Sequence, residues 1–223
     1  MKKNLFAEAI IKFLLGVVLV GLLIFLPAGT FRFFGGWLLM GILFVPMFLA
    51  GLVMLKKSPD LLKSRLAAKE KRAEQDLVVK LSGLMFIAGF VVAGLDFRFG
   101  WLRLPQWVTW VAAVLFLIAY VLYAEVLREN AYLSRTIEVQ ENQTVVDTGL
   151  YGIVRHPMYS ATLLLFLSMP LVLGSAISFL CFLCYPALII KRLKDEENFL
   201  EKELPGYKEY KQKVKYRLVP GIW

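Results

Sequence analysis

Residues 148–160 read TGLYGIVRHPMYS, and this run separates a polar segment from an almost wholly apolar one. It contains His156, the only histidine of the 223-residue chain. Proline lacks a backbone N–H and has a fixed φ, so Pro157 suits the first turn of a helix, while the residue before it favours an extended backbone. We therefore expect a helix to begin at Pro157. Arg155 and His156 would lie in the loop before it, and Tyr159 one turn inside.

The apolar run that follows the loop extends from residue 157 to residue 190. Because about 20 apolar residues cross a bilayer, this run is too long for one ordinary span. Gly174-Ser175 divides it into two runs of about sixteen residues, each marginally short for a span. The pattern predicts a helical hairpin, tilted or shallow, with its turn near Gly174. Pro170 and Pro186 are positions at which the arms can bend.

Upstream of the loop, four more apolar stretches are long enough to cross the membrane. The chain is 59% hydrophobic, with a mean hydropathy of +0.65, which is far above an ordinary soluble domain. We expect an all-α integral membrane protein with four transmembrane helices plus a C-terminal helical hairpin, about six membrane helices in all, followed by an amphipathic cytoplasmic helix. The four upstream spans are predicted at residues 7–28, 33–55, 77–95 and 107–126.

Two charged segments lie outside these spans. In the first, residues 56–76, leucines and an alanine recur at helical spacing, which fits a surface helix on the bilayer or, equally, a solvated connector. In the second, the tail 191–223, apolar residues recur every three or four positions, as on one face of an amphipathic helix. Pro205-Gly206 is expected to interrupt that helix. The tail face consists of Leu200, Leu204, Tyr207, Tyr210 and Val214.

The lysines and arginines predict the orientation in the membrane. On the predicted topology, 23 of the 26 lie on one side, and only Arg32, Arg98 and Arg103 lie on the other. The positive-inside rule then places both termini in the cytoplasm, together with the loop and the tail. We divide the chain into an N-terminal membrane region, 1–126, with its cytoplasmic loop 56–76, and a C-terminal region, 127–223. The latter comprises a cofactor loop 127–156, the hairpin 157–190 and a cytoplasmic tail helix 191–223.

Other features of the composition have ordinary explanations. A net charge of +9 would suggest a nucleic-acid partner for a soluble protein, but here the basic residues flank apolar segments, so membrane orientation explains them and no nucleic acid is expected. Cys181 and Cys184 have C-x-x-C spacing without a second Cys or His pair, which favours small core residues over a redox or metal site. No convincing metal-ligand set is present. Asp96 is expected to pair with Arg98, the alternative being a buried functional carboxylate.

A second polar cluster, residues 191–197, leaves the far arm of the predicted hairpin. Because a hairpin returns its ends to one side, this cluster can meet the Arg155–Tyr159 loop. Arg192 and Glu196 are four residues apart and therefore lie one above the other on a helix. Taken alone, a histidine at an interface is most often structural, and adjacent glutamates usually face solvent. The pairing of the two clusters across one hairpin favours a functional site.

These clusters together resemble the isoprenylcysteine carboxyl methyltransferase family and its wider relatives, the phospholipid N-methyltransferases. The resemblance covers about residue 143 to the C-terminus, and the segment 96–101 also looks like bacterial members of the group. The matching motifs are Gly149-x-Tyr151, Arg155-His156-Pro157-x-Tyr159, the apolar hairpin, Arg192-x-x-x-Glu196-Glu197 and Tyr207-x-x-Tyr210-x-x-x-Val214.

The resemblance implies an integral membrane enzyme that uses S-adenosylmethionine, held on the cytosolic side by the loop before the hairpin and the helix after it. Arg192 would face the methyl acceptor, and His156 and Tyr159 would complete the catalytic set. Arg155 would tie the loop to a carboxylate. The implied cofactor contacts are Gln143, Thr144, Val145, Val146, Tyr151, His156, Pro157, Met158, Tyr159 and Glu196.

The expected activity is methyl transfer from S-adenosylmethionine to a lipid or lipid-like acceptor, a lipophilic small molecule or lipidated chain that enters laterally from the bilayer. A carboxylate acceptor needs no base, whereas an amine must first lose a proton, for which His156, Tyr159 or Glu197 are candidates. The alternatives are a membrane reductase of the steroid-reductase type that uses a nicotinamide cofactor, and a non-enzymatic scaffold or transporter. The sequence leaves open the acceptor, the methylated atom and the oligomeric state.

Overall fold

The structure is a computed structural model that describes residues 2–66, 73–130, 132–133 and 139–223. Within those ranges the secondary structure is helical, apart from one isolated bridge between Arg103 and Ser175. The helices are α1 (Lys2–Ala28), α2 (Phe34–Lys57), α3 (Pro59–Leu66), α4 (Ala73–Phe99), α5 (Gln106–Glu129), the short 3₁₀ helix η1 (Gly149–Gly152), α6 (Pro157–Val172), α7 (Ala176–Phe182), α8 (Tyr185–Glu203) and α9 (Tyr207–Lys213).

Within the described residues, five helical segments are long and apolar enough to cross a membrane: 5–28, 34–57, 75–99, 106–129 and 176–203. The first four correspond to the four predicted spans, and the fifth combines α7 and α8. The all-α, multi-pass membrane fold is therefore confirmed. Helix α6 is apolar but only 16 residues long, so the count of six membrane helices stays a prediction.

The predicted hairpin is present. Helix α6 begins at Pro157, and the turn to α7 contains Gly174 with a φ of +70°, a conformation that glycine adopts at little cost. The second arm is interrupted after Phe182 and resumes at Tyr185, because Pro186 in the first turn of α8 cannot donate the hydrogen bond that a continuous helix requires. Helix α8 then continues past residue 190 into the charged segment, whose Lys, Glu and Leu residues are strong helix formers.

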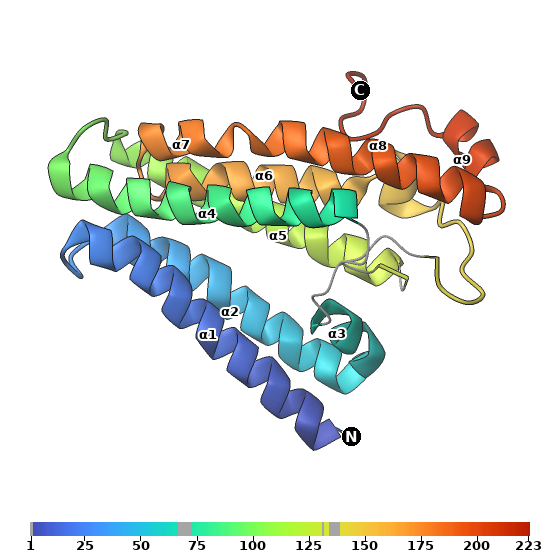
Figure 1. Ribbon diagram of the computed structural model, residues 1–223, viewed down its shortest axis with the longest axis horizontal. Helices are drawn as coiled ribbons and strands as arrows, with labels where there is room; N and C mark the ends of the chain where they lie inside the picture. The colour runs from blue at the N-terminus through green and yellow to red at the C-terminus, as the bar shows by residue number, and fades with distance from the viewer. Residues whose placement is uncertain (1, 67–72, 131, 134–138) are drawn as a thin grey trace.

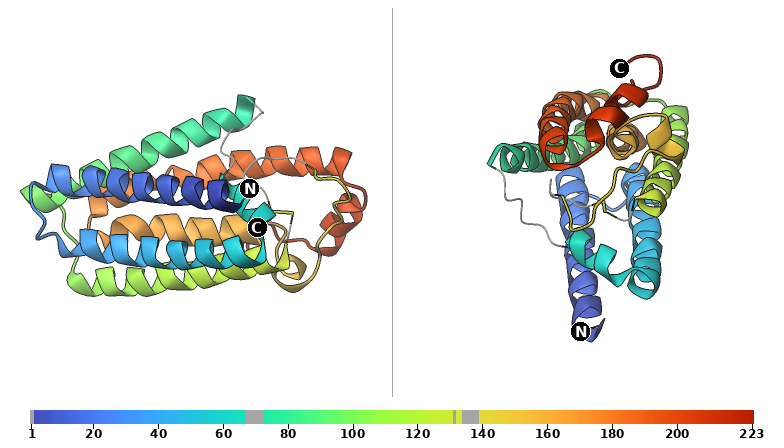
Figure 2. Two further views of the ribbon diagram at one scale, coloured as in Figure 1. Left: turned by 90° about the horizontal axis from the view of Figure 1, so that it is seen from below. Right: turned by 90° about the vertical axis from the view of Figure 1, so that its right-hand side faces the viewer.

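Figure 1 shows α4, α5, α6 and the α7–α8 arm running along the long axis as one bundle. Helices α1 and α2 form a pair that diverges from this bundle toward the end where both termini lie. Packing is most extensive between α5 and α6, between α1 and α4, and between α4 and α7. The further views in Figure 2 show α3 beside the end of the α1–α2 pair that carries the N-terminus. Both termini, α3 and α9 therefore lie toward one end of the molecule.

Small residues bring the helices of the bundle close together. A Cβ atom on Gly89 of α4 would lie 2.2 Å from the Phe182 ring of α7, and one on Gly94 would lie 2.5 Å from the Ile24 carbonyl oxygen of α1. Phe182 and Ile24 are both fully buried in the core cluster. Glycine at these two positions thus permits the close helix contacts that membrane proteins use.

At the end opposite the termini, Asp96 corrects one prediction. Its carboxylate is fully buried and accepts hydrogen bonds from the Leu102 N–H (2.7 Å) and the Ser175 hydroxyl (2.5 Å). It does not pair with Arg98, whose guanidinium lies over the Phe99 ring. A buried carboxylate needs hydrogen-bond donors. The chain that turns back after α4 brings the Leu102 N–H to the Asp96 carboxylate, whereas the Arg98 guanidinium does not reach it. Asp96 therefore ties the α4–α5 connection to the hairpin turn.

The two cysteines correct another prediction. Cys181 is partly exposed, Cys184 is exposed, and both are free thiols rather than core residues. The core-facing side of α7 is occupied by Ser178 and Phe182, which are four residues apart and fully buried. Cys181 does not belong to this core-facing side of α7, and Cys184 follows the end of the helix.

The charged segment between α2 and α4 is helical where it is described. Helix α3 occupies residues 59–66, and Leu62 on it is buried while Lys63 is exposed. This supports the surface-helix interpretation over a plain connector for those eight residues. Ala67, which also belongs to the predicted apolar pattern, lies outside the described residues.

Candidate functional site

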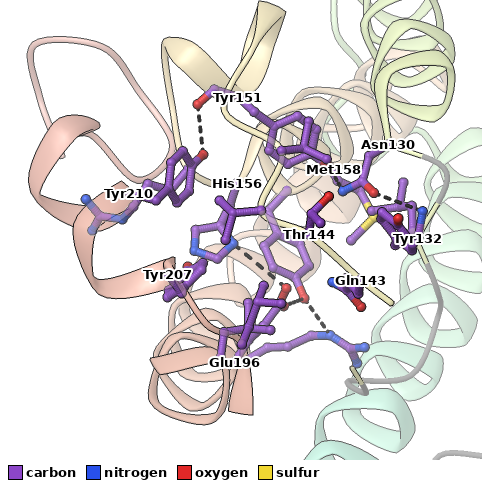
Figure 3. A pocket seen from close by; sticks show the side chains of 18 residues that line it. Asn130, Tyr132, Gln143, Thr144, Tyr151, His156, Met158, Glu196, Tyr207 and Tyr210 are labelled. Atoms are coloured by element: carbon purple, nitrogen blue, oxygen red, sulfur yellow. Dashed lines mark hydrogen bonds and ion pairs between the residues drawn. The ribbon is translucent and has the colours of Figure 1, made fainter. Parts of the chain in front are cut away.

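A cavity lies at the end of the bundle near the C-terminus, between the α5–α6 connection, the start of α6, α8 and α9 (Figure 3). Its lining combines apolar side chains with phenols, amides, an imidazole, two guanidinium groups and one carboxylate. The lining residues are Asn130, Tyr132, Leu133, Gln143, Thr144, Val145, Val146, Tyr151, Arg155, His156, Met158, Tyr159, Arg192, Glu196, Leu200, Leu204, Tyr207 and Tyr210.

Most residues that the sequence singles out meet in this cavity. All the implied cofactor contacts except one line it, and so does Arg192. The exception is Pro157, which is buried at the first position of α6 and so serves to start the helix that carries Met158 and Tyr159. Glu197, one of the three candidate bases, is not among the lining residues either. His156 and Tyr159 remain at the cavity.

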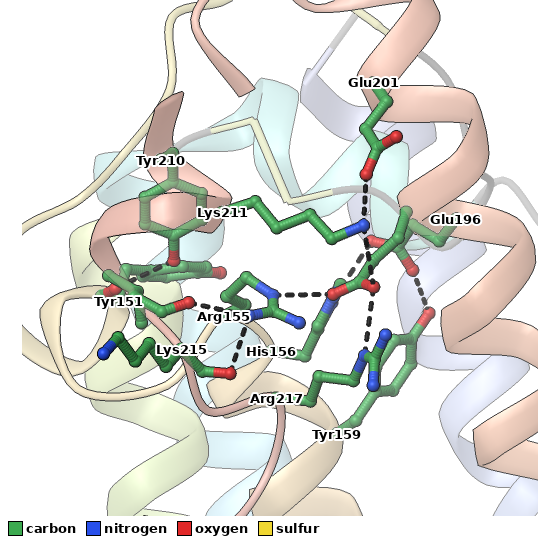
Figure 4. A network of polar contacts seen from close by, with 12 residues as sticks. Tyr151, Arg155, His156, Tyr159, Glu196, Glu201, Tyr210, Lys211, Lys215 and Arg217 are labelled. Carbon is green, nitrogen blue, oxygen red and sulfur yellow. Dashed lines mark hydrogen bonds and ion pairs between the residues drawn. The ribbon is translucent and has the colours of Figure 1, made fainter. Parts of the chain in front are cut away.

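Glu197 instead takes part in a network of polar contacts with Arg155, His156 and Arg217, which are labelled in Figure 4. Its side chain is 3% exposed, and one carboxylate oxygen accepts from Arg155 Nε at 2.7 Å and lies 3.2 Å from His156 Nε2. The other oxygen accepts from Arg217 Nε at 3.0 Å. Charge-assisted bonds of this kind compensate the desolvation of a buried carboxylate. Glu197 of α8 therefore joins the loop before α6 to the tail.

The tail continues these contacts through its backbone. Arg155 Nη1 donates to the carbonyl oxygens of Val214 (2.7 Å) and Lys215 (2.9 Å). The backbone N–H groups of Arg155 and His156 donate to the carbonyl oxygens of Tyr216 (2.9 Å) and Arg217 (3.0 Å). The expectation that Arg155 ties the loop to a carboxylate is confirmed, and the chain after α9 closes over the same loop.

Arg192, Tyr159 and Glu196 form a chain of hydrogen bonds along one wall of the cavity. The Tyr159 hydroxyl donates to the Glu196 carboxylate and accepts from Arg192 Nε at 3.0 Å. Arg192 and Glu196, which the sequence places one turn apart on a helix, are thus both hydrogen-bonded to the Tyr159 hydroxyl of α6. Tyr159 is buried, whereas the Glu196 side chain is 22% exposed and can reach a ligand.

His156 lies between the two glutamates of α8. Its Nε2 is 3.2 Å from a Glu197 oxygen, its Nδ1 is 4.0 Å from a Glu196 oxygen, and its ring stacks against that of Tyr159. A buried carboxylate beside Nε2 favours the tautomer that carries the proton there. Nδ1 is then the nitrogen on the Glu196 side, and its lone pair is available in the neutral ring.

Three tyrosines frame the opposite wall. The Tyr210 hydroxyl donates to the Tyr151 carbonyl oxygen at 2.8 Å, and Asn130 donates to the Tyr151 hydroxyl at 3.0 Å. Burial raises the pKa of Tyr151 to about 12 and raises the pKa values of Tyr207 and Tyr210 as well. Among the described residues, the buried Tyr207 hydroxyl has no hydrogen-bond partner. A buried polar atom of this kind in a cavity wall is available to a bound molecule.

The tail face predicted from the sequence packs together as expected. Leu204, Tyr207, Tyr210 and Val214 form one buried cluster, with Leu200 partly buried against it. The face is not one continuous helix, because Gly206 adopts a φ of +85° between α8 and α9. The predicted interruption at Pro205-Gly206 is confirmed. The turn directs Tyr207 and Tyr210 toward the cavity.

Sequence reasoning missed part of the lining. Asn130 and Tyr132 follow α5 without any recognisable motif, and only their position in a polar segment beside a membrane span could have indicated a role. Tyr207 and Tyr210 were identified by their helical spacing, which indicates packing and carries no information about a cavity. Leu133, Leu200 and Leu204 also line it.

Residues 107–205 match the sequence model of the phospholipid methyltransferase family. The match extends from the start of α5 to the residues just after α8, so it includes most of the cavity lining. It confirms the resemblance to the membrane methyltransferases and extends it upstream to α5.

A curated relative is the Delta(14)-sterol reductase TM7SF2 of Mus musculus, which is 31% identical over 91 residues. The aligned segment covers 40% of this chain and 22% of the reductase. The chain therefore spans about a fifth of the length of this relative. The similarity shows that a related sequence also occurs in a sterol reductase.

Proposed function

We propose that this chain, whose residues 107–205 match the phospholipid methyltransferase family, transfers a methyl group from S-adenosylmethionine to a lipid or lipid-like acceptor. The observation that carries the proposal is the cavity itself. Residues of the α5–α6 connection, of the start of α6 and of α8 converge on it, although Asn130 and Leu200 are 70 residues apart in the chain.

The cavity has the chemistry that S-adenosylmethionine requires. The cofactor carries an ammonium, a carboxylate, a sulfonium and an adenosine. The Glu196 carboxylate suits the cationic groups, and the apolar side chains of Met158, Leu200 and Leu204 suit the purine. The unpartnered Tyr207 hydroxyl offers a further polar contact. Segment 143–146 would contact the cofactor through its backbone.

In this assignment α8 serves both partners of the reaction. Glu196 holds the cofactor, and Arg192 faces the acceptor. Tyr159, hydrogen-bonded to both, fixes the distance between the two side chains. Bound S-adenosylmethionine supplies an electrophilic methyl group on sulfur. The residues around it align the acceptor for in-line displacement and exclude water.

The acceptor determines whether a base is needed. A carboxylate acceptor reacts as its anion, with Arg192 positioned to hold it. An amine acceptor must first be deprotonated, and His156 Nδ1 and the Tyr159 hydroxyl are the candidate groups at the cavity. Glu197 is engaged with Arg155 and Arg217 and is not proposed as a base.

Calorimetry of the detergent-purified chain with S-adenosylmethionine and S-adenosylhomocysteine tests the assignment. We expect saturable binding that weakens about tenfold or more in Glu196→Ala and Tyr159→Ala, because each removes a charged or charge-linked contact. Glu203→Ala is the matched control, since this exposed glutamate of the same helix does not line the cavity. Absence of binding by folded protein with lipid present would overturn the proposal.

The similarity to a sterol reductase favours one alternative, a nicotinamide-dependent membrane reductase. The Arg192–Tyr159–Glu196 chain fits a zwitterionic cofactor end better than a dinucleotide phosphate. Titration with NADPH and NADP⁺ under the same conditions separates the two. Binding of a nicotinamide cofactor in place of S-adenosylmethionine would establish the reductase.

We also propose that the cavity and both termini face the cytoplasm. The structure brings both termini, α3 and the cavity toward one end of the molecule, where the predicted topology gathers 23 of the 26 lysines and arginines. In the proposed division, residues 1–126 supply the membrane scaffold and residues 127–223 supply the cofactor and acceptor sites.

A further inference from the structure

A second cavity lies among α1, α2 and α3, separate from the one described above. Its volume is about 300 Å³. Its walls are apolar side chains of α1 and α2, and α3 contributes Leu62, Arg65 and Leu66. The only cationic residues in its lining, among the residues described, are Lys12 and Arg65. An apolar groove that ends in positive charge is the shape of a site for an amphiphile.

The two cations differ in their partners. Lys12 Nζ donates to Glu8 at 2.6 Å and to the Leu66 carbonyl oxygen at 2.9 Å, which ties α1 to the end of α3. Arg65 Nε and Nη2 are buried, and neither has a hydrogen-bond partner among the described residues. The guanidinium lies over the Tyr123 ring of α5, 5.7 Å from its centroid.

Buried N–H groups of the Arg65 guanidinium that have no partner among the described residues favour binding of an anion. Leaving desolvated N–H groups unpaired is unfavourable in free energy. The planar fork of arginine matches the oxygens of a phosphate group. Exposed Lys56 and Lys57 add positive charge at the end of α2, which favours anionic lipids over neutral ones.

We propose that the groove among α1, α2 and α3 binds one anionic phospholipid, with an acyl chain between the helices and its phosphate on Arg65. The lipid site itself does not depend on methyl transfer.

The probe is phosphatidylglycerol that carries a fluorophore on one acyl chain, bound to delipidated full-length chain in detergent. Unlabelled phosphatidylglycerol should displace it more effectively than phosphatidylcholine with the same acyl chains. Arg65→Gln should weaken binding about tenfold and remove the preference for the anionic lipid, as expected for loss of one charge-assisted pair. Lys63→Gln, an exposed position on the same helix, should leave both unchanged.

A second pair of variants tests the acyl chain. Gly51 lines the groove, and a side chain there would meet nothing within 4 Å, so Gly51→Leu should fold and fill the groove. Gly41, on the same helix, also has open space and does not line the groove. We expect Gly51→Leu to weaken binding and Gly41→Leu to leave it intact.

Two results would overturn the proposal. Equal losses in Arg65→Gln and Lys63→Gln would indicate diffuse attraction to a basic surface. Unchanged binding in Gly51→Leu would show that no acyl chain occupies the groove. No methyl donor is present in the assay, so these outcomes are independent of the methyltransferase proposal.

Discussion

Glu197 is held by groups from two other segments of the chain, which lie far apart in the sequence. Arg155 and His156 belong to the loop before α6, and Arg217 belongs to the tail. The carboxylate is almost fully buried, so it depends on these donors. Removing one member of a buried pair leaves the others uncompensated.

We therefore expect Arg155→Ala to destabilise the protein by roughly 3–5 kcal/mol, the range for breaking a buried ion pair. The free energy of unfolding in detergent, measured by denaturant titration, is the readout. Arg128→Ala breaks an exposed pair with Glu125 and should leave that free energy unchanged. Equal effects of the two substitutions would contradict the structural role assigned to Arg155.

The buried tyrosines give a pH prediction. Tyr151 has its pKa raised from 10.0 to about 12 in the folded state, so the folded protein holds this proton more tightly than the unfolded chain. Its contribution to stability is complete below pH 10 and is lost as the pH rises through about 12. Unfolding curves across this range should show the loss, and Tyr151→Phe should reduce it. A pH-independent stability would contradict the assignment.

The sequence predicts that site residues of one compact motif lie close together. His156, Met158 and Tyr159 follow one another at a helix start, so a single local rule places them together. The partners of Glu197 could not be predicted in full, because Arg217 reaches it only after the tail folds back. Nor does any local pattern distinguish the Tyr207 hydroxyl, which lacks a partner, from that of Tyr210, which has one.

Helices α4 and α7 lie very close together at Gly89. We expect Gly89→Ala to destabilise the protein by about 1–3 kcal/mol, because its Cβ would overlap the Phe182 ring in a fully packed core. Gly83, on the same helix, has open space around it, so Gly83→Ala should be neutral or slightly stabilising. Thermal unfolding of the two variants in one detergent compares them directly. Similar midpoints would show that the helices are not held at this distance.

The sequence predicted helix starts and turns better than helix ends. The fixed φ of Pro157 and the freedom of Gly174 to adopt a positive φ are local properties of the backbone, and the structure confirms the helix start and the turn. The change from apolar to charged composition near residue 190 marks no helix boundary, because the charged residues are themselves helix formers. The break after Phe182 follows from Pro186, but nothing local determines whether a proline bends or interrupts a helix.

For the whole molecule, the distribution of charge predicts the topology. In a variant with Cys181 and Cys184 replaced by alanine, we expect Lys63→Cys and Lys208→Cys to react with an impermeant thiol reagent from one side of sealed vesicles. Arg32→Cys should react only from the other side. All three positions are exposed. Reaction of positions 63 and 32 from the same side would contradict the orientation.

The divergence of α1 and α2 from the rest of the bundle was not predictable. Both helices are apolar on all sides, and in lipid an apolar surface has no preference between a neighbouring helix and the bilayer. The packing of α1 against α4 is instead determined by shape, at small residues such as Gly94. The number and order of the helices therefore follow from the composition, while their arrangement does not.

The return of the tail to the loop before α6 has a consequence for biosynthesis. Residues 214–217 leave the ribosome after every apolar helix, yet they supply hydrogen bonds that hold Arg155 and His156 beside the cavity. We expect a nascent chain arrested before residue 214 to integrate its helices into the bilayer without completing the cavity. Membrane insertion and completion of the cavity are then successive events, and the second depends on residues 214–217.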